Sequence, residues 1–233
     1  MKGKNGLETV YFKEIDSTND YVKIRRGEGK DLLAVAKKQT GGRGTKGRSF
    51  QSEKGGVYLS LLRFYEDFPA REAFKIMAGA ATAVCEVLED CGLSPVIKWP
   101  NDIHVNGKKI CGILIENAFG LDKVTSSVVG IGLNVYNELD EELAFIATTI
   151  KRETGKRFSV HKLAKKLAWL LYRETDLCAY QKRLGYMGGA ATLLLGDERI
   201  PATLVSVDEE GNLLALAGGE LRRFAAAEVS LRV

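Results

Sequence analysis

The 233-residue sequence is poor in the residues that build metal centres, disulfide frameworks and flexible linkers. Its four cysteines include no Cys-x-x-Cys pair, and His104 and His161 are the only histidines, which argues against a structural zinc site. Four prolines and no low-complexity tract argue against a long disordered linker. Residues 1–12 lack the apolar segment of a signal peptide, and no apolar run could span a bilayer. We therefore expect a cytoplasmic protein with reduced thiols and no membrane partner.

The composition is that of a globular protein with a modest positive charge. Hydrophobic residues make up 45% of the chain and charged residues 27%, so the length suits one large domain, alone or with a small second domain. The net charge of +4 is compatible with an anionic ligand. Lysine and arginine are spread along the chain, whereas a protein that grips a nucleic-acid backbone concentrates them, so we expect no nucleic-acid partner.

Hydrophobic periodicity and turn residues predict strands and helices in the first four-fifths of the chain. Alternating or apolar runs predict strands at about 9–14, 31–39, 55–64 and 126–136. Asn106-Gly107 permits positive φ at both central turn residues, so we expect a tight hairpin between residues 103–105 and 108–116. The Ser-x-x-Asp start at residue 17 and the apolar spacings predict helices at about 17–26, 71–90, 139–152 and 159–182. The last helix should bury Leu163, Leu167, Leu170 and Leu171.

The C-terminal part has a different pattern. After the stretch KRLGYMGGA, short strands alternate with turns of the sequences GD, DEEGN and GG. Such spacing predicts a small β-barrel of about 45 residues. We therefore expect two domains, at residues 1–186 and 187–233.

The glycine-rich loop at residues 39–50, QTGGRGTKGRSF, is the most unusual local feature. It contains a G-x-G-x-x-G match at residues 42–47, but a loop and a strand follow where a dinucleotide-binding motif requires a helix. One interpretation is a mobile, solvated basic loop. The other is an anion site, because glycines let backbone N–H groups approach an anion while Arg43, Lys46 and Arg48 supply positive charge. The position of the loop between two predicted strands favours the anion site.

Five stretches of the chain occur in an order that resembles one known family. They are IDSTN (15–19), QTGGRGTKGRSF (39–50), KWPNDI (98–103), GKKICGILIE (107–116) and VVGIGLNV (128–135). Together they resemble the biotin protein ligases, also called biotin–[acetyl-CoA-carboxylase] ligases. The resemblance implies an α+β fold: a central mixed β-sheet with flanking helices, as in class II synthetases, followed by a small SH3-like β-barrel.

The resemblance also implies a reaction in two steps. Biotin and ATP give biotinyl-5′-adenylate and pyrophosphate, and the biotinyl group then passes to a lysine of a biotin carboxyl carrier domain. Because the first step brings two anions together, cationic groups and Mg²⁺ are needed to offset their repulsion. The implied cofactors are ATP and Mg²⁺, with biotin as substrate. No metal cluster made by the protein alone is expected, and Asp102 is the side chain implied for contact with the Mg²⁺.

Individual roles follow from the same resemblance. Lys109 and Arg43 would be catalytic, with Lys109 as a fixed cation between carboxylate and phosphate. The expected biotin-binding residues are Ser17, Thr18, Asn19, Gln39, Gly42, Arg43, Gly44, Lys109, Gly112, Gly130 and Gly132. The expected ATP-binding residues are Arg43, Arg48, Trp99, Asn101, Asp102, Lys109, Asn134 and Arg232. The resemblance is compatible with a homodimer. Because IDSTN begins at residue 15, it implies a chain without the N-terminal DNA-binding domain of some members.

Local structure offers an alternative explanation for several of these residues. Residues 17–19 are also explained by a helix cap, and Asn101 and Asp102 by an Asx turn. Asn134 suits a strand-end turn, and Arg232 an exposed surface position. Two other functions stay open at this point. A lipoate ligase or octanoyltransferase shares the fold, and a nucleic-acid-binding module could use the basic loop.

The loop departs from the family pattern at Thr45, where an arginine is usual. We predict that the activated intermediate is held less tightly in consequence, because Lys46 offers a point charge and no bidentate fork. A Thr45→Arg variant should therefore release biotinyl-adenylate more slowly than the wild type, as measured by recovery of the adenylate in an ultrafiltrate. Equal release from both proteins would contradict this prediction.

Overall fold

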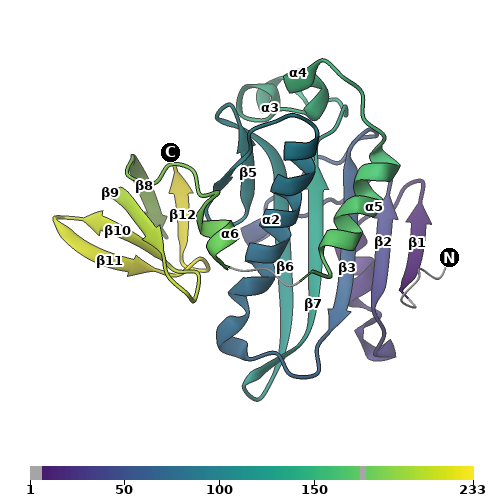
Figure 1. Ribbon diagram of the computed structural model, residues 1–233, viewed down its shortest axis with the longest axis horizontal. Helices are drawn as coiled ribbons and strands as arrows, with labels where there is room; N and C mark the ends of the chain where they lie inside the picture. Colours follow the sequence, from purple (N-terminus) through teal and green to yellow (C-terminus); the bar gives the residue numbers. More distant parts are fainter. Residues whose placement is uncertain (1–6, 174–176) are drawn as a thin grey trace.

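The computed structural model describes residues 7–173 and 177–233, which form two β-sheets and flanking helices (Figure 1). The larger sheet has seven strands in the order β1-β2-β3-β7-β6-β5-β4. Their bounds are β1 Glu8–Phe12, β2 Leu32–Ala36, β3 Val57–Phe64, β4 Val96–Lys98, β5 Asp102–Val105, β6 Lys108–Gly120 and β7 Lys123–Leu133. β1 pairs with β2 in parallel and the other neighbours pair antiparallel, so the predicted mixed sheet is confirmed.

The two faces of this sheet have different coverings. Helices α2 (Phe74–Asp90) and α5 (Val160–Leu170) cover one face (Figure 1). On β7, Val129, Ile131 and Leu133 belong to the main apolar core, as does most of the buried face of α2. Val128 belongs to a second, smaller cluster with Val22 of helix α1 (Thr18–Lys23). Because side chains alternate along a strand, Gly130 and Gly132 share the α1 face with Val128. That face carries the candidate site.

Several elements that local sequence signals predicted are present in the structure. Ser17 caps α1, since its Oγ accepts a hydrogen bond from the backbone N–H of Asp20 at 3.3 Å. Asn106 and Gly107 have φ values of 49° and 76° and join β5 to β6, so the predicted hairpin is confirmed. The helix expected from residue 71 begins at Phe74 instead, after the 3₁₀ turn Ala70–Glu72.

Two predicted helices are wrong in extent. The one expected at 139–152 is two short helices, α3 (Glu141–Ile146) and α4 (Ile150–Thr154). Between them Ala147 is extended and Thr149 caps α4, and this break lets the N–H of Thr148 donate to the carbonyl of Lys109 at 2.9 Å. The helix expected at 159–182 ends at Leu170 as α5, and α6 spans Leu177–Gln181. Residues 174–176 of that prediction lie outside the described residues.

The predicted leucine face of α5 is confirmed in large part. Leu163, Leu167 and Leu170 are buried, whereas Leu171 follows the helix and is half-buried. Within the described part of the chain, every helix is too short or too polar to cross a membrane.

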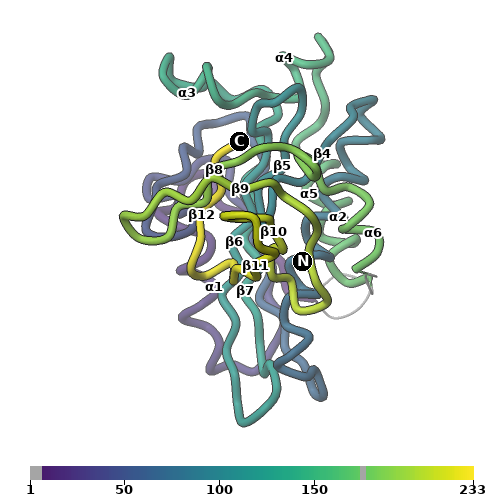
Figure 2. Tube along the Cα trace, turned by 90° about the vertical axis from the view of Figure 1, so that its left-hand side faces the viewer, coloured from purple at the N-terminus to yellow at the C-terminus, as the bar shows by residue number. Residues whose placement is uncertain are grey.

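The smaller sheet lies beside the β4–β5 edge of the larger one (Figure 1, Figure 2). It is antiparallel, with the strand order β11-β10-β9-β8-β12. The strand bounds are β8 Ala190–Leu195, β9 Glu198–Val207, β10 Leu213–Ala217, β11 Glu220–Phe224 and β12 Val229–Arg232. β11 and β12 form its two edges, so closure into a barrel and a domain boundary at residue 186 stay predictions.

His104 of β5 connects the larger sheet to the segment that leads into the smaller one. Its Nδ1 lies 2.8 Å from the hydroxyl of Tyr186. Burial, together with the charge of Lys98, lowers the pKa of His104 from 6.5 to about 4. The unfolded chain therefore binds a proton more readily than the folded chain between these two values, and stability is lost as the pH falls through this window.

We predict that lowering the pH from about 7.5 to about 5 destabilises the wild type by about 2 kcal/mol more than a His104→Gln variant. The reason is that glutamine removes the titrating group while it keeps a polar partner for Tyr186. Urea unfolding at both pH values measures the difference. An equal loss of unfolding free energy in the two proteins would contradict the lowered pKa of His104.

Candidate active site

Glycines form the floor of the site on the α1 face of the larger sheet. Across the strands, Gly132 of β7 pairs with Tyr58 of β3 on one side and with Gly112 of β6 on the other. A Cβ at Gly132 would lie 2.5 Å from Cε1 of Phe50, and a Cβ at Gly112 would lie 3.2 Å from Cε2 of the same ring. The Phe50 ring therefore rests on two adjacent glycines, at a distance that a larger residue would not allow.

A network of neutral polar side chains borders this floor at the start of α1. The backbone N–H and the hydroxyl of Thr18 both donate to Oε1 of Gln39, each at 2.8 Å. The Gln39 amide N–H donates to Ser52 Oγ at 3.0 Å, and Ser60 Oγ lies 2.7 Å from Thr18 Oγ1. Thr18 and Ser60 are buried. The structure thus brings the predicted residues Thr18 and Gln39 together, with Ser17 next to them as the helix cap.

Asn19 extends the network toward β6 and β7. Its Oδ1 lies 2.5 Å from Ser60 Oγ, and its amide N–H donates to Glu116 Oε2 at 3.2 Å. Partial burial raises the pKa of Glu116, but hydrogen bonds from Lys23 and Asn19 outweigh this effect and lower it overall. A Cβ at Gly130 would overlap with Asn19 Oδ1, so the absence of a side chain there makes room for Asn19.

Ser60 and Glu116 are site residues that the sequence analysis did not assign. Ser60 has a recognisable signal, because it is a single small polar residue inside the apolar strand VYLSLLRF. Glu116 stands at the end of GILIE, where a carboxylate on a mainly apolar strand is a similar exception. A lone polar residue in a buried strand is therefore a sequence signal of a polar site, because buried polar groups need partners.

The glycine-rich loop forms an ordered turn that closes on itself. The N–H of Gly44 donates to the carbonyl of Arg48 at 2.7 Å, and the N–H of Phe50 donates to the carbonyl of Gly42 at 2.8 Å. A Cβ at Gly42 would overlap with the Phe50 carbonyl, so glycine is required at this position. Lys46 has a φ of 56°, in the left-handed region. The backbone of the loop is therefore internally hydrogen-bonded, while the side chains of Arg43, Lys46 and Arg48 are exposed to solvent.

The cations of the loop have weak partners within the molecule. Arg43 Nη2 lies 2.8 Å from Asp20 Oδ2, with the Arg43 side chain 60% exposed. Arg48 donates to the carbonyl and hydroxyl of Thr45, at 3.2 and 2.9 Å. Since exposed ion pairs contribute about 0–1 kcal/mol, these side chains can exchange their partners at little cost.

Lys109 lies on the glycine floor and pairs with Asp102. Its Nζ is 2.6 Å from Asp102 Oδ1 and 5.8 Å from the centre of the Phe50 ring. Asp102 faces Gly112 across the β5–β6 pair, so the ion pair lies beside the floor. The contact of Thr148 with the Lys109 carbonyl holds the backbone of this lysine in place.

Further cations surround the Lys109–Asp102 pair. Lys98 lies opposite Asp102 across the β4–β5 pair and is half-buried. Burial lowers the pKa of Lys98, and the charge of Asp102 partly offsets this effect. The positive charges of Lys109, Arg48 and Arg232 lower the pKa of Lys98 further. Lys98 thus feels one carboxylate and three further cations, and this excess of positive charge makes the region suited to an anion.

Three predicted ATP-binding residues already have partners inside the protein. Asn101 donates to the carbonyl of Ile113 at 2.7 Å, and Asn134 Oδ1 accepts from Asn137 at 3.1 Å. Both asparagines are buried. Trp99 is 2% exposed, and its indole N–H donates to the carbonyl of Gly211 at 2.9 Å. The Trp99 indole is therefore a buried support of this segment, and its contact with a nucleotide stays a prediction.

In the part of the chain that the structure describes, His, Cys, Asp and Glu side chains gather nowhere in groups of three or more that could hold a metal ion. Asp102 pairs with Lys109 through Oδ1. One carboxylate together with substrate phosphates is a usual ligand set for Mg²⁺. The residues present therefore fit a Mg²⁺ that arrives with a phosphate ligand.

The fold is similar to that of biotin protein ligases of known structure. The biotin protein ligase from Aquifex aeolicus in complex with biotin and ATP aligns with a TM-score of 0.74 and 30% identity, over 97% of this chain and 98% of that one. The biotin protein ligase from Leishmania major in complex with biotinyl-5-AMP aligns with a TM-score of 0.63 and 25% identity, over 94% and 99% of the two chains. The predicted fold class is thereby confirmed.

Sequence comparison identifies the family. Bifunctional ligase/repressor BirA from Escherichia coli (strain K12) is 30% identical over 242 residues, which cover 98% of this chain and 75% of that protein. BirA from Bacillus subtilis (strain 168) is 37% identical over 161 residues, and the match spans about half of its length, 49%. The biotin/lipoate A/B protein ligase family matches residues 11–134, and this chain belongs to that family.

The close approach of Asn19 to Gly130 leads to a stability prediction. Gly130→Ala should reduce the free energy of unfolding by about 1–3 kcal/mol, because the new methyl group overlaps with the Asn19 amide. Gly120→Ala, near the far end of the same hairpin, is the matched control, since a Cβ there meets only a flexible methyl group of Thr125 at 3.0 Å.

Urea unfolding of the two variants measures the difference. A second arm combines Gly130→Ala with Asn19→Ala, which removes the overlapping amide. The cost of Gly130→Ala should then shrink, and the double-mutant cycle reports the coupling between the two positions. Equal costs of Gly130→Ala in both backgrounds would show that the overlap with Asn19 is not the cause.

Proposed function

We propose that this protein is an ATP-dependent biotin–protein ligase. It joins biotin to ATP to give biotinyl-5′-adenylate and then transfers the biotinyl group to a lysine of a biotin carboxyl carrier domain, as in acetyl-CoA carboxylase. The observation that carries the proposal is the position of Lys109. Its ammonium lies beside Gly112 of the glycine floor and 2.6 Å from Asp102 Oδ1, and Asp102 in turn faces Lys98, which feels the charges of Lys109, Arg48 and Arg232.

The polar pocket suits the ureido ring of biotin because it is rich in acceptors. Oε1 of Gln39 faces two donors of Thr18, whereas the single hydroxyl proton of Ser60 faces both Thr18 Oγ1 and Asn19 Oδ1. One proton can serve only one of these two oxygens, so an acceptor is left for a ligand N–H. A cyclic urea offers two N–H donors and one carbonyl acceptor, with no net charge.

The first step forms a bond between a carboxylate oxygen of biotin and the α-phosphorus of ATP. The bond from that phosphorus to the bridging oxygen breaks, and pyrophosphate leaves. Lys109, Arg43 and Arg48 supply positive charge where the two anions meet, and such pre-positioned charge stabilises the transition state. Backbone N–H groups from Gly42 to Gly44 lie in the same loop, and Gly112, Gly130 and Gly132 leave space for the bicyclic ring.

The nucleotide would use the opposite part of the site. Asp102 would hold Mg²⁺ together with the phosphates, and the metal would neutralise negative charge during the transfer. Asn101, Asn134 and Arg232 would contact the nucleotide there, and the segment from Trp99 to Asp102 would line this part of the site. In the second step, the amine of the acceptor lysine attacks the carbonyl carbon of the adenylate, and AMP leaves with the mixed-anhydride oxygen.

The lipoate ligase alternative fits less well. A polar network on a glycine floor matches a compact, neutral head group, whereas an acyl chain needs a long apolar groove. Incubation with Mg²⁺-ATP, a biotin carboxyl carrier domain and biotin should raise the mass of the carrier by one biotinyl group. Parallel incubations with lipoate and octanoate should leave the carrier unmodified, and modification by either acid in preference to biotin would overturn the assignment.

Lys109→Met should reduce biotin-dependent pyrophosphate release by about 100-fold or more, because two charge-assisted hydrogen bonds to the reacting anions are lost. Methionine preserves most of the length of the side chain, so the fold should be retained. Lys108→Met is the matched control, since Lys108 donates to the carbonyl of Ala144 at 3.1 Å, away from the pocket. Near-normal pyrophosphate release from the Lys109 variant would refute the role of this lysine.

A further inference from the structure

The segment that bears Asp102 is attached to the smaller sheet through Trp99. The indole of Trp99 is buried, and its N–H donates to the carbonyl of Gly211 at 2.9 Å, a contact between residues 112 positions apart. Gly211 has a φ of 85°, and a Cβ there would overlap with the ring of Phe74 on α2. The turn that contains Gly211 is therefore packed closely against the larger part of the molecule.

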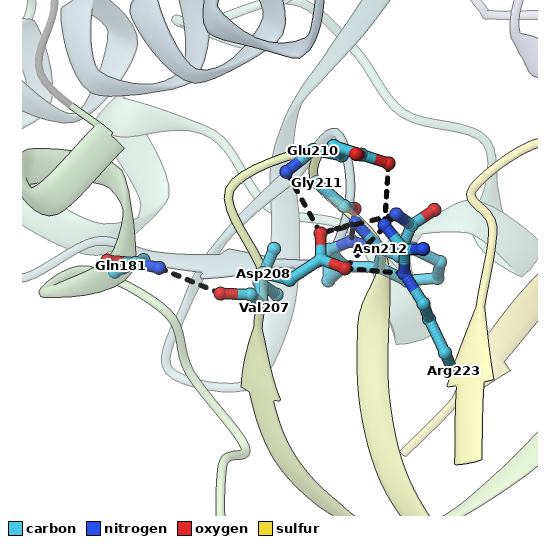
Figure 3. A network of polar contacts seen from close by, with 8 residues as sticks. Gln181, Val207, Asp208, Glu210, Gly211, Asn212 and Arg223 are labelled. Atoms are coloured by element: carbon cyan, nitrogen blue, oxygen red, sulfur yellow. Dashed lines mark hydrogen bonds and ion pairs between the residues drawn. The ribbon is translucent and has the colours of Figure 1, made fainter. Parts of the chain in front are cut away.

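This turn, which spans residues 208–212 and joins β9 to β10, is ordered by the carboxylate of Asp208 (Figure 3). Asp208 accepts hydrogen bonds from the backbone N–H groups of Glu210 and Asn212, at 3.0 and 2.8 Å. Arg223 of β11 donates to Asp208 Oδ2 and to Glu210 Oε2, each at 2.6 Å. The Asp208–Arg223 contacts thus fix the turn from its outer side.

The segment before Asp102, residues 97–100, is also held by the chain that leads into the smaller sheet. The hydroxyl of Tyr180 donates to the carbonyl of Pro100 at 2.9 Å. Ile97 pairs with the chain just before the smaller sheet. Its N–H donates to the backbone carbonyl of Arg183 at 2.7 Å, and its carbonyl accepts from the backbone N–H of Gly185 at 2.9 Å. Residues 97–100 are therefore clamped between the linking segment and the 208–212 turn, directly before Asp102.

We propose that the 208–212 turn is a positioning element for the nucleotide half of the site. It acts through the Trp99–Gly211 hydrogen bond, which sets the place of Asn101 and Asp102, and the positioning residues are Trp99, Asp208 and Arg223. The inference rests on the proposed function, because it assigns these residues to the binding of ATP. The biotin pocket, built from Thr18, Gln39 and Ser60, has no hydrogen bond to this turn among the described residues.

Two variants test the positioning. Trp99→Phe keeps a ring in the core and removes only the N–H donor, whereas Arg223→Met releases the outer side of the turn without touching the site. Each should weaken the binding of an unreactive ATP analogue, measured by calorimetry, by about threefold to tenfold, as expected for the loss of one hydrogen bond or ion pair. Biotin affinity, measured in the same way, should stay within about twofold of the wild-type value.

Arg222→Met is the matched control, because Arg222 is the neighbour of Arg223 on β11 and stacks on the ring of Phe224. It should leave both affinities unchanged. A direct contact of the Trp99 ring with ATP would change the affinity in Trp99→Phe alone, and a normal ATP affinity in Arg223→Met would therefore overturn the positioning role. A variant that loses thermal stability but keeps both wild-type affinities would overturn it as well.

The wild-type protein separates this inference from the proposed function. If the wild type binds neither biotin nor the ATP analogue, the proposed function fails. If the wild type binds both and the two variants match it, the proposed function stands and the positioning role fails. A selective loss of ATP-analogue affinity in both variants supports the proposed role of the turn.

Discussion

The ion pair between Lys109 and Asp102 is the contact around which the site is arranged. At 2.6 Å, the two charges neutralise each other next to the glycine floor. Lys98, Arg48 and Arg232 then leave the region with a net positive charge. An arriving phosphate can therefore bind without removing Asp102 from the pair, because the surrounding cations supply charge that the single carboxylate does not cancel. A site with equal numbers of both signs would lack this attraction.

The two faces of the central sheet have different roles. One face packs against the helices α2 and α5, and the other carries the candidate site. On β7, Val129, Ile131 and Leu133 pack under the helices, whereas Gly130 and Gly132 face α1. The alternation of side chains along a strand permits this division within a few residues. The polar face costs packing energy, since glycine and serine bury little apolar surface. The two helices on the other face supply the apolar contacts that offset this cost.

Local chemistry made parts of this structure predictable, and long-range contacts made other parts unpredictable. The Ser17 cap and the Asn106-Gly107 turn depend on a few neighbouring residues, and both were read correctly. The helix predicted at 139–152 was wrong because the chain breaks at Thr148 to support Lys109. Trp99 was assigned to the nucleotide through the family resemblance, which gives no sign of its contact with the smaller sheet. Its partner Gly211 is distant in the sequence, and the contact uses the backbone carbonyl, so no side chain indicates it.

The glycine-rich loop shows how a self-repelling sequence can remain folded. Its backbone closes through hydrogen bonds from Gly44 and Phe50, so the turn does not depend on the charges. The charges are instead held by exposed, weak partners, Asp20 for Arg43 and Thr45 for Arg48. Such contacts prevent repulsion within the loop and yet cost little to exchange for a phosphate. Buried pairs would withhold the arginines from an anion, because breaking a buried pair leaves an uncompensated charge. The weakness of these pairs is thus the property that a binding loop requires.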